Sequence, residues 1–115
     1  KGIALTFKSK FGGVDELKRQ QPTIGGVCTL SRGGRYIYYL ITKAKYWNKP
    51  TYDHLRSSLE AMKAHCAAHR VRAVAMPQIG CGLDGLKWGP VQDILRTVFP
   101  PECGIKITVY IYRKP

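Results

Sequence analysis

From residue 27 onward the sequence alternates between short segments typical of strands and longer segments typical of helices, and this order constrains the fold more than any other feature. Four segments have the β-branched and aromatic residues, or the alternating pattern, of strands: 27–30, 36–42, 71–76 and 105–111. Helical patterns separate the last three of them. Because strands joined by helical crossovers run parallel, we expect an α/β fold in which these three strands end at the same edge.

Each of the two helical patterns has an apolar face, which predicts packing against a sheet. After Pro50, Thr51 is a typical N-cap residue, and apolar side chains recur at steps of four, three and four, at Leu55, Leu59, Met62 and Cys66. The second helix is expected to have Pro90 near its first position and to stop at Pro100, with four apolar residues on one face: Val91, Ile94, Leu95 and Val98.

The remaining segments predict two short helices, a hairpin and a buried strand. Apolar residues over 3–11 indicate one helix and 14–20 indicate another. The strands 27–30 and 36–42 are separated by Ser31–Gly34, a spacing typical of an antiparallel hairpin. The segment 71–76 is short, apolar and followed by Pro77, which favours a strand buried in a sheet over an alternating surface strand.

Size and charge indicate one basic domain. The chain has 115 residues, and its 19 Lys and Arg against 7 Asp and Glu give a net charge of +12. An anionic partner is therefore expected, either nucleic acid, a phosphorylated metabolite or an anionic polymer. A solvated basic surface is the alternative. The apolar segments are too short for a membrane helix, so no membrane partner is expected.

The four cysteines do not form a zinc pattern. Cys28, Cys66, Cys81 and Cys103 include no CxxC pair, and no histidine lies at zinc-finger spacing from them. Cys28 and Cys66 fall where the pattern requires buried apolar residues. We therefore expect no metal, and reduced thiols in a nuclear or cytosolic protein.

Two polar residues follow strands at the edge where open α/β sheets bind ligands. Lys43 comes directly after the strand 36–42, and Asp84 lies in the glycine loop Gly80–Gly85 beyond the strand 71–76. This loop matches GxGxxG, but only one strand follows it, which excludes a dinucleotide-binding fold. Its glycines and the following helix suit an anion. The alternatives are a solvated lysine and a tight turn.

Several segments together resemble one family, the macrodomains. The similarity covers residues 1–17, 34–43, 49–66, 76–88 and 105–110, and the motifs LITK and PQIGCGLD are far more specific than GxGxxG. These segments look like the macrodomains of glycohydrolases that remove terminal ADP-ribose from proteins. DNA ADP-ribosyl glycohydrolases of the DarG type are similar in the same places.

The resemblance implies a three-layer α/β/α macrodomain with a mixed sheet that binds ADP-ribose at its carboxyl edge without a cofactor. Lys43 and Asp84 match the catalytic lysine and aspartate of the family. The ligand-binding positions of the family match Gly2, Gln78, Ile79, Gly80, Cys81, Gly82, Leu83 and Asp84. The expected partners are ADP-ribose and ADP-ribosylated proteins, together with poly(ADP-ribose) or nucleic acid on the basic surface.

The sequence departs from the family in two respects. Family members begin with two further strands that carry part of the ligand pocket, and nothing in residues 1–115 matches them, so we expect a single, N-terminally incomplete macrodomain. Gln78 stands where a basic residue is expected, which would weaken diphosphate binding.

Three functions are compatible with these features. The first is a hydrolase that removes ADP-ribose from glutamate or aspartate through an adduct on Lys43 resolved by Asp84, and that also deacylates O-acyl-ADP-ribose. Such a hydrolase would reverse ADP-ribosylation in the DNA damage response. The second is a reader of ADP-ribose or poly(ADP-ribose) without turnover. The third is a nucleic-acid-binding protein, including a hydrolase of ADP-ribosylated DNA or RNA.

Overall fold

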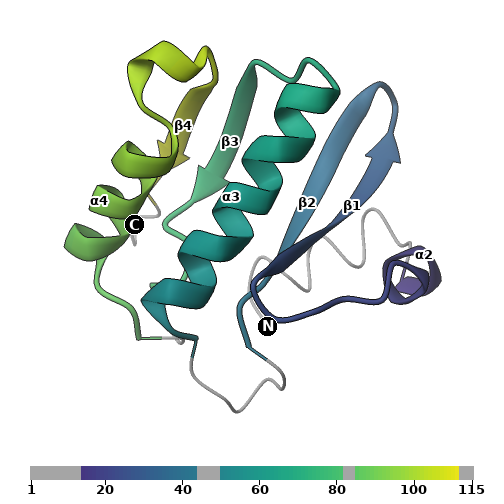
Figure 1. Cartoon of the computed structure of the whole chain (residues 1–115), viewed down its shortest axis with the longest axis horizontal. Coiled ribbons are helices and arrows are strands. Elements are labelled where there is room, and N and C mark those ends of the chain that lie inside the picture. The colour runs from purple at the N-terminus through teal and green to yellow at the C-terminus, as the bar shows by residue number, and fades with distance from the viewer. Residues whose placement is uncertain (1–13, 44–49, 82–84, 112–115) are drawn as a thin grey trace.

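The computed structural model describes residues 14–43, 50–81 and 85–111 (Figure 1). The elements in these ranges follow the predicted order: α2 (Val14–Arg19), β1 (Gly26–Arg32), β2 (Arg35–Ile41), α3 (Tyr52–Ala68), β3 (Ala73–Pro77), α4 (Trp88–Val98), the 3-10 helix η1 (Pro101–Cys103) and β4 (Lys106–Tyr110). The helix predicted over 3–11 lies outside the described residues. The Thr51 cap is confirmed, because its hydroxyl accepts a hydrogen bond from the His54 N–H at 3.0 Å.

β1 and β2 form the predicted antiparallel hairpin, in which Arg32 pairs with Arg35 next to the turn. Only Gly33 and Gly34 lie in the turn, so both strands reach further toward it than the sequence indicated. Both glycines have positive φ angles, 56° and 78°. Two-residue hairpin turns of this kind need positive φ at both positions, and glycine adopts it without steric cost.

β3 and β4 pair in parallel, with Ala73 opposite Lys106 and Pro77 opposite Tyr110. Figure 1 shows that β2, β3 and β4 all end at the same edge, at the bottom of the view, as predicted. Antiparallel and parallel pairs are thus both present. Among the described strands, however, β2 and β3 are not hydrogen-bonded neighbours, and two two-stranded ladders result. A helical crossover fixes the direction of the next strand but not its adjacency.

α3 and α4 lie on the same face of the strands (Figure 1) and share one core with them. The stripe predicted for α3 is buried throughout. The buried members of the core are Leu55, Leu59, Met62, Cys66, Met76, Val91, Leu95, Val98 and Phe99. The prediction that the strand 71–76 is buried on both faces was wrong. Met76 faces the core, but Ala73 and Ala75 on the other face are exposed, so β3 alternates in burial.

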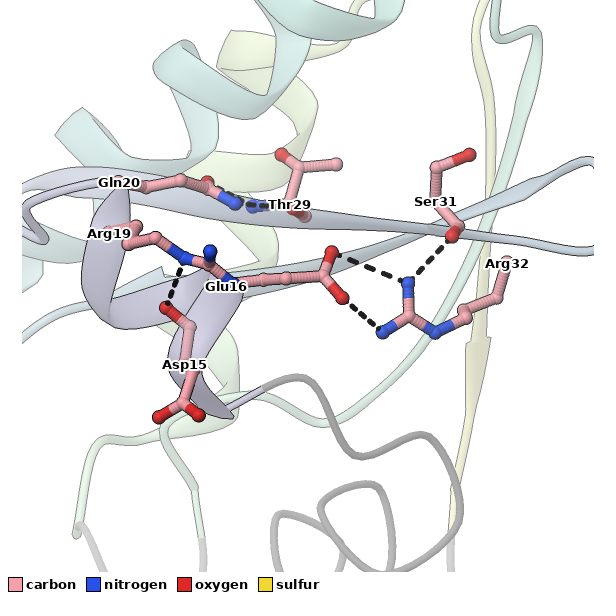
Figure 2. Close-up of polar contacts among 7 residues, drawn as sticks. All are labelled: Asp15, Glu16, Arg19, Gln20, Thr29, Ser31 and Arg32. Carbon is pink, nitrogen blue, oxygen red and sulfur yellow. Dashed lines mark hydrogen bonds and ion pairs between the residues drawn. The ribbon is translucent and has the colours of Figure 1, made fainter.

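α2 is attached to the outer side of β1 by side chains, as Figure 2 shows. The Gln20 carboxamide donates to the Thr29 carbonyl at 2.7 Å and accepts from the Thr29 N–H at 2.8 Å. The Arg32 guanidinium contacts the Glu16 carboxylate at 2.7 Å and lowers the pKa of Glu16 through this hydrogen bond. The amide of Gln20 therefore takes the place of a neighbouring strand at this part of the β1 edge.

Candidate functional site

Lys43 lies just beyond the end of β2, and that end is held by two hydrogen bonds. The carbonyl of Ile41 accepts from the N–H of Gly25 at 2.6 Å and from the hydroxyl of Ser58 at 3.2 Å. Ser58 belongs to α3 and is fully buried. Because both bonds fix the peptide two residues before Lys43, the half-buried lysine leaves the strand from a defined position.

The segment after β3 forms a tight turn at the same edge. The N–H of Cys81 donates to the carbonyl of Gln78 at 3.3 Å, and Gly80 has a φ of 73°. A positive φ at the third position of such a turn favours glycine. The carbonyl of Gly80 also accepts from the N–H of Leu86 at 2.8 Å. This bond closes the loop and fixes where the chain enters α4.

The side chains of Ile79 and Cys81 pack against the core. Burial raises the pKa of the Cys81 thiol, so this thiol stays protonated at neutral pH and is a poor nucleophile. These two side chains therefore anchor the turn, and its peptide groups are better suited than its side chains to contact a ligand.

The first turns of α3 and α4 begin at this edge as well (Figure 1). They are linked directly, since the hydroxyl of Tyr52 accepts from the N–H of Lys87 at 3.0 Å. The N-terminal end of a helix has a partial positive charge and unpaired N–H groups, both of which attract anions. The edge thus combines a lysine, a glycine turn and two helix starts, a set that can hold a phosphorylated ligand beside an amine.

Five of the residues predicted for the site are described: Lys43 comes shortly after the end of β2, and Gln78, Ile79, Gly80 and Cys81 come directly after the end of β3. Gly2, Gly82, Leu83 and Asp84 lie outside the described residues. Two residues that position the candidate site, Ser58 and Tyr52, were not predicted from the sequence. A signal existed for Ser58, a polar residue inside the apolar stripe of its helix, where burial requires a hydrogen-bond partner. We find no comparable signal for Tyr52.

Other parts of the described structure have fewer groups suited to bind a ligand or to react with it. A shallow groove of about 350 Å³ lies between α3 and α4, away from the edge, and is lined by Glu60, Lys63, Ala64, Ala67, Thr97 and Val98. Within residues 14–43, 50–81 and 85–111, no group of three or more His, Cys, Asp or Glu residues is arranged to hold a metal ion. None of the described helices is long and apolar enough to cross a membrane.

Comparison with known proteins identifies the class. The Macro domain family matches residues 1–95, and the chain belongs to this family. The chain is a homologue of the ADP-ribose glycohydrolase OARD1 of Bos taurus, with 57% identity over 109 residues that cover 95% of this chain and 71% of that protein.

Solved structures agree with this assignment and confirm the predicted macrodomain fold. The macrodomain of Thermus aquaticus DarG is 28% identical and superposes with a TM-score of 0.84 over all of this chain and 80% of that one. Thermosipho africanus DarTG in complex with ADP-ribose shares the fold, with 22% identity and a TM-score of 0.78 over all of this chain and 36% of that one.

Proposed function

We propose that this macrodomain hydrolyses the ester between ADP-ribose and a protein glutamate or aspartate. The unprotonated amine of Lys43 attacks the anomeric carbon of the ribose, and the carbon–oxygen bond to the protein carboxylate breaks as the carbon–nitrogen bond forms. The carboxylate leaves with the electron pair, and Asp84 takes the proton from the nitrogen. Water then attacks the anomeric carbon as the carbon–nitrogen bond breaks. Asp84 returns its proton to the leaving amine and takes one from the water, which releases ADP-ribose and regenerates Lys43.

The observation that carries this proposal is that β2, which leads to Lys43, and β3, which leads to a glycine turn suited to an anion, end at the same edge. The Ile41 carbonyl is fixed by Ser58 and Gly25, and the turn Gln78–Cys81 ends β3 at the same edge. The homologue from Bos taurus is named as an ADP-ribose glycohydrolase. We further propose that Gly2, Gly82, Leu83 and Asp84 complete the ligand site, and that the same chemistry deacylates O-acyl-ADP-ribose.

The test is a covalent species on Lys43. The protein is incubated with glutamate-linked ADP-ribose, and trypsin-digested samples are analysed by mass spectrometry. Asp84→Ala should retain the adduct and lose turnover, because the base that resolves the adduct is missing. Lys43→Ala should form no adduct but should still bind ADP-ribose in calorimetry. Turnover of Lys43→Ala at the wild-type rate would refute the lysine mechanism.

The same experiment separates the hydrolase from two alternatives. A reader of ADP-ribose or poly(ADP-ribose) should bind the ligand but form no adduct with any substrate. The 31% identity over 120 residues to a DNA ADP-ribosyl glycohydrolase of Thermus aquaticus favours ADP-ribosylated DNA as a second substrate. Release of ADP-ribose from a modified oligonucleotide, compared with release from a modified peptide, decides between the two substrates.

We also propose that the protein works in a reducing compartment, the nucleus or the cytosol, and reverses ADP-ribosylation in the DNA damage response. The four cysteines are free thiols, and Cys28 and Cys66 are buried. Thiols persist in reducing compartments, whereas disulfides are typical of exported proteins. Immunofluorescence of the tagged protein before and after DNA damage tests this localisation.

A further inference from the structure

We propose that the edge opposite the candidate site binds single-stranded nucleic acid. This edge contains the end of α3, the start of β2 and the starts of β3 and β4 (Figure 1). Six residues at these ends form what we call the opposite-edge surface: Arg35, Tyr36, His69, Arg70, Arg72 and Lys106. All of them are exposed except Tyr36, which is half-buried.

The opposite-edge surface is positively charged. No Asp or Glu lies between Glu60 and Asp84, a stretch that includes the end of α3 and all of β3. Arg72 and Lys106 are adjacent, because the N–H of Lys106 donates to the carbonyl of Arg72 at 2.8 Å. Glu102 in η1 is the acidic residue nearest to Lys106 in the sequence. Four arginine and lysine residues therefore lie at neighbouring ends of helices and strands, and a row of phosphates is the complementary partner.

The backbone of Arg70 has an unusual conformation for an arginine. Arg70 has a φ of 58°, in the left-handed region that favours glycine. It follows the cap residue His69, and the N–H of Val71 donates to the carbonyl of Cys66 at 2.8 Å, which is the pattern of a helix end that normally carries glycine. Arginine is thus present where glycine would be more stable. An unfavourable residue of this kind points to a function of its side chain.

A group of packed aromatic rings lies beside these cations. The rings of His65 and His69 stack at 3.9 Å with an interplanar angle of 12°, and Tyr36 lies edge-on to His69 at 5.4 Å. Both histidine rings are held in place, since Nδ1 of His65 is bonded to the hydroxyl of Tyr38 at 2.8 Å and Nδ1 of His69 donates to the carbonyl of His65 at 3.0 Å. Aromatic groups next to cations bind unpaired bases by stacking.

Single-stranded nucleic acid fits this surface better than a duplex or a small anion. A duplex keeps its bases inside the helix, so the ring of His69 would have no base to stack on. A single phosphate would need only one or two of the four cations. The proposal does not depend on ADP-ribose chemistry, because none of the six residues belongs to the candidate site.

The binding test measures a fluorescein-labelled 20-nucleotide oligothymidine by anisotropy from 50 to 300 mM salt. For single strands each phosphate contact contributes about 0.7 to the slope of log affinity against log salt, so four cations predict a slope near −3. Arg70→Gly should lower the affinity about fivefold at 0.1 M salt and reduce the slope by about 0.7. Its melting temperature should equal or exceed that of the wild type, because glycine relieves the left-handed backbone.

Two matched variants make the test specific. Lys18→Gln removes one exposed positive charge from α2 and should change the affinity less than twofold. His69→Ala should weaken binding of the oligothymidine but not of a 20-base-pair duplex. An Arg70→Gly protein that binds like the wild type would overturn the proposal. It would also be overturned if Lys18→Gln lost as much affinity as Arg70→Gly, or if the duplex bound as tightly as the single strand.

Competition with saturating ADP-ribose shows which of the two edges binds the oligothymidine. Displacement of the oligothymidine by ADP-ribose would place its binding at the candidate site, as expected for a poly(ADP-ribose)-type ligand there, and would overturn the proposal. Simultaneous binding of both ligands supports it. Since ADP-ribose release is measured in the same preparations, a failure of the hydrolase proposal and a failure of this one give different results.

Discussion

The substitution Gly80→Ala tests whether the turn after β3 is built for a ligand. Gly80 has a φ of 73°, and a Cβ atom at this position would lie 2.7 Å from Cδ1 of Leu86. An alanine in the left-handed region costs about 1–2 kcal/mol, offset by about 0.4–1 kcal/mol from the reduced freedom of the unfolded chain. The contact with Leu86 adds about 1 kcal/mol, the low end for overpacking, because this side chain can change its rotamer.

Gly104→Ala is the matched control for this change. Gly104 has a φ of 76°, but nothing lies within 4 Å of an added Cβ, and the residue precedes β4 at the opposite edge. Both variants therefore carry the same backbone cost, and their difference isolates the contact with Leu86. In urea denaturation we expect Gly80→Ala to be less stable than Gly104→Ala by about 1 kcal/mol, which is about 4 °C in melting temperature for a domain of this size.

The effect of Gly80→Ala on ADP-ribose binding tests the function of the turn. The carbonyl of Gly80 accepts from the N–H of Leu86, so a displaced Leu86 changes the loop that closes the turn. Calorimetry with ADP-ribose should show at least tenfold weaker binding by Gly80→Ala and unchanged binding by Gly104→Ala. If the two variants unfold at the same urea concentration and bind ADP-ribose equally well, the role assigned to this turn is wrong.

Three further changes test the parts of the fold that hold the site and the edges. Ser58→Ala removes the hydroxyl that donates to the Ile41 carbonyl, and should lower the free energy of unfolding in urea by about 1 kcal/mol. The turnover of this variant should fall, and Ser58→Thr should restore part of it. Unchanged turnover would show that the end of β2 does not need this hydrogen bond. Burial lowers the pKa of His65 below the usual 6.5, so the unfolded chain binds the proton first. The free energy of unfolding should therefore be highest well above pH 6.5 and should decrease as the pH falls below this value. If the free energy of unfolding of His65→Gln decreases just as steeply, the loss has another cause. Gln20→Ala uncovers the N–H and carbonyl of Thr29 on the outer side of β1, and should lower the free energy of unfolding by about 1 kcal/mol. The variant should also aggregate more than the wild type when heated, as measured by light scattering. Equal aggregation of the two proteins would show that Gln20 does not protect this edge.

The local elements could be predicted because each depends on residues close together in the sequence. The apolar stripe of α3 recurs at helical spacing, and Thr51 caps the helix from its own first turn. The pair Gly33–Gly34 can adopt the positive φ angles that a tight hairpin turn needs. Lys43 comes two residues after the end of β2, so the direction of the strands was enough to predict its position at the carboxyl edge.

The burial and the pairing of the strands could be predicted less well from the sequence. Ala73 and Ala75 are apolar and made the segment 71–76 look buried on both faces, but a small apolar side chain is compatible with either environment. The helical crossover between β2 and β3 predicted their common direction, yet it contains no information on whether the two strands hydrogen-bond to each other.

The sequence by itself determined the order of the elements, their apolar faces and the edge at which the site lies, because periodicity and chain direction are properties of neighbouring residues. Only the tertiary structure decided which groups from different elements meet: the hydroxyl of Ser58 with the carbonyl of Ile41, and the amide of Gln20 with the backbone of Thr29. These contacts depend on how α2 and α3 dock, and docking is fixed by the summed packing of the whole core, so no short stretch of sequence specifies them.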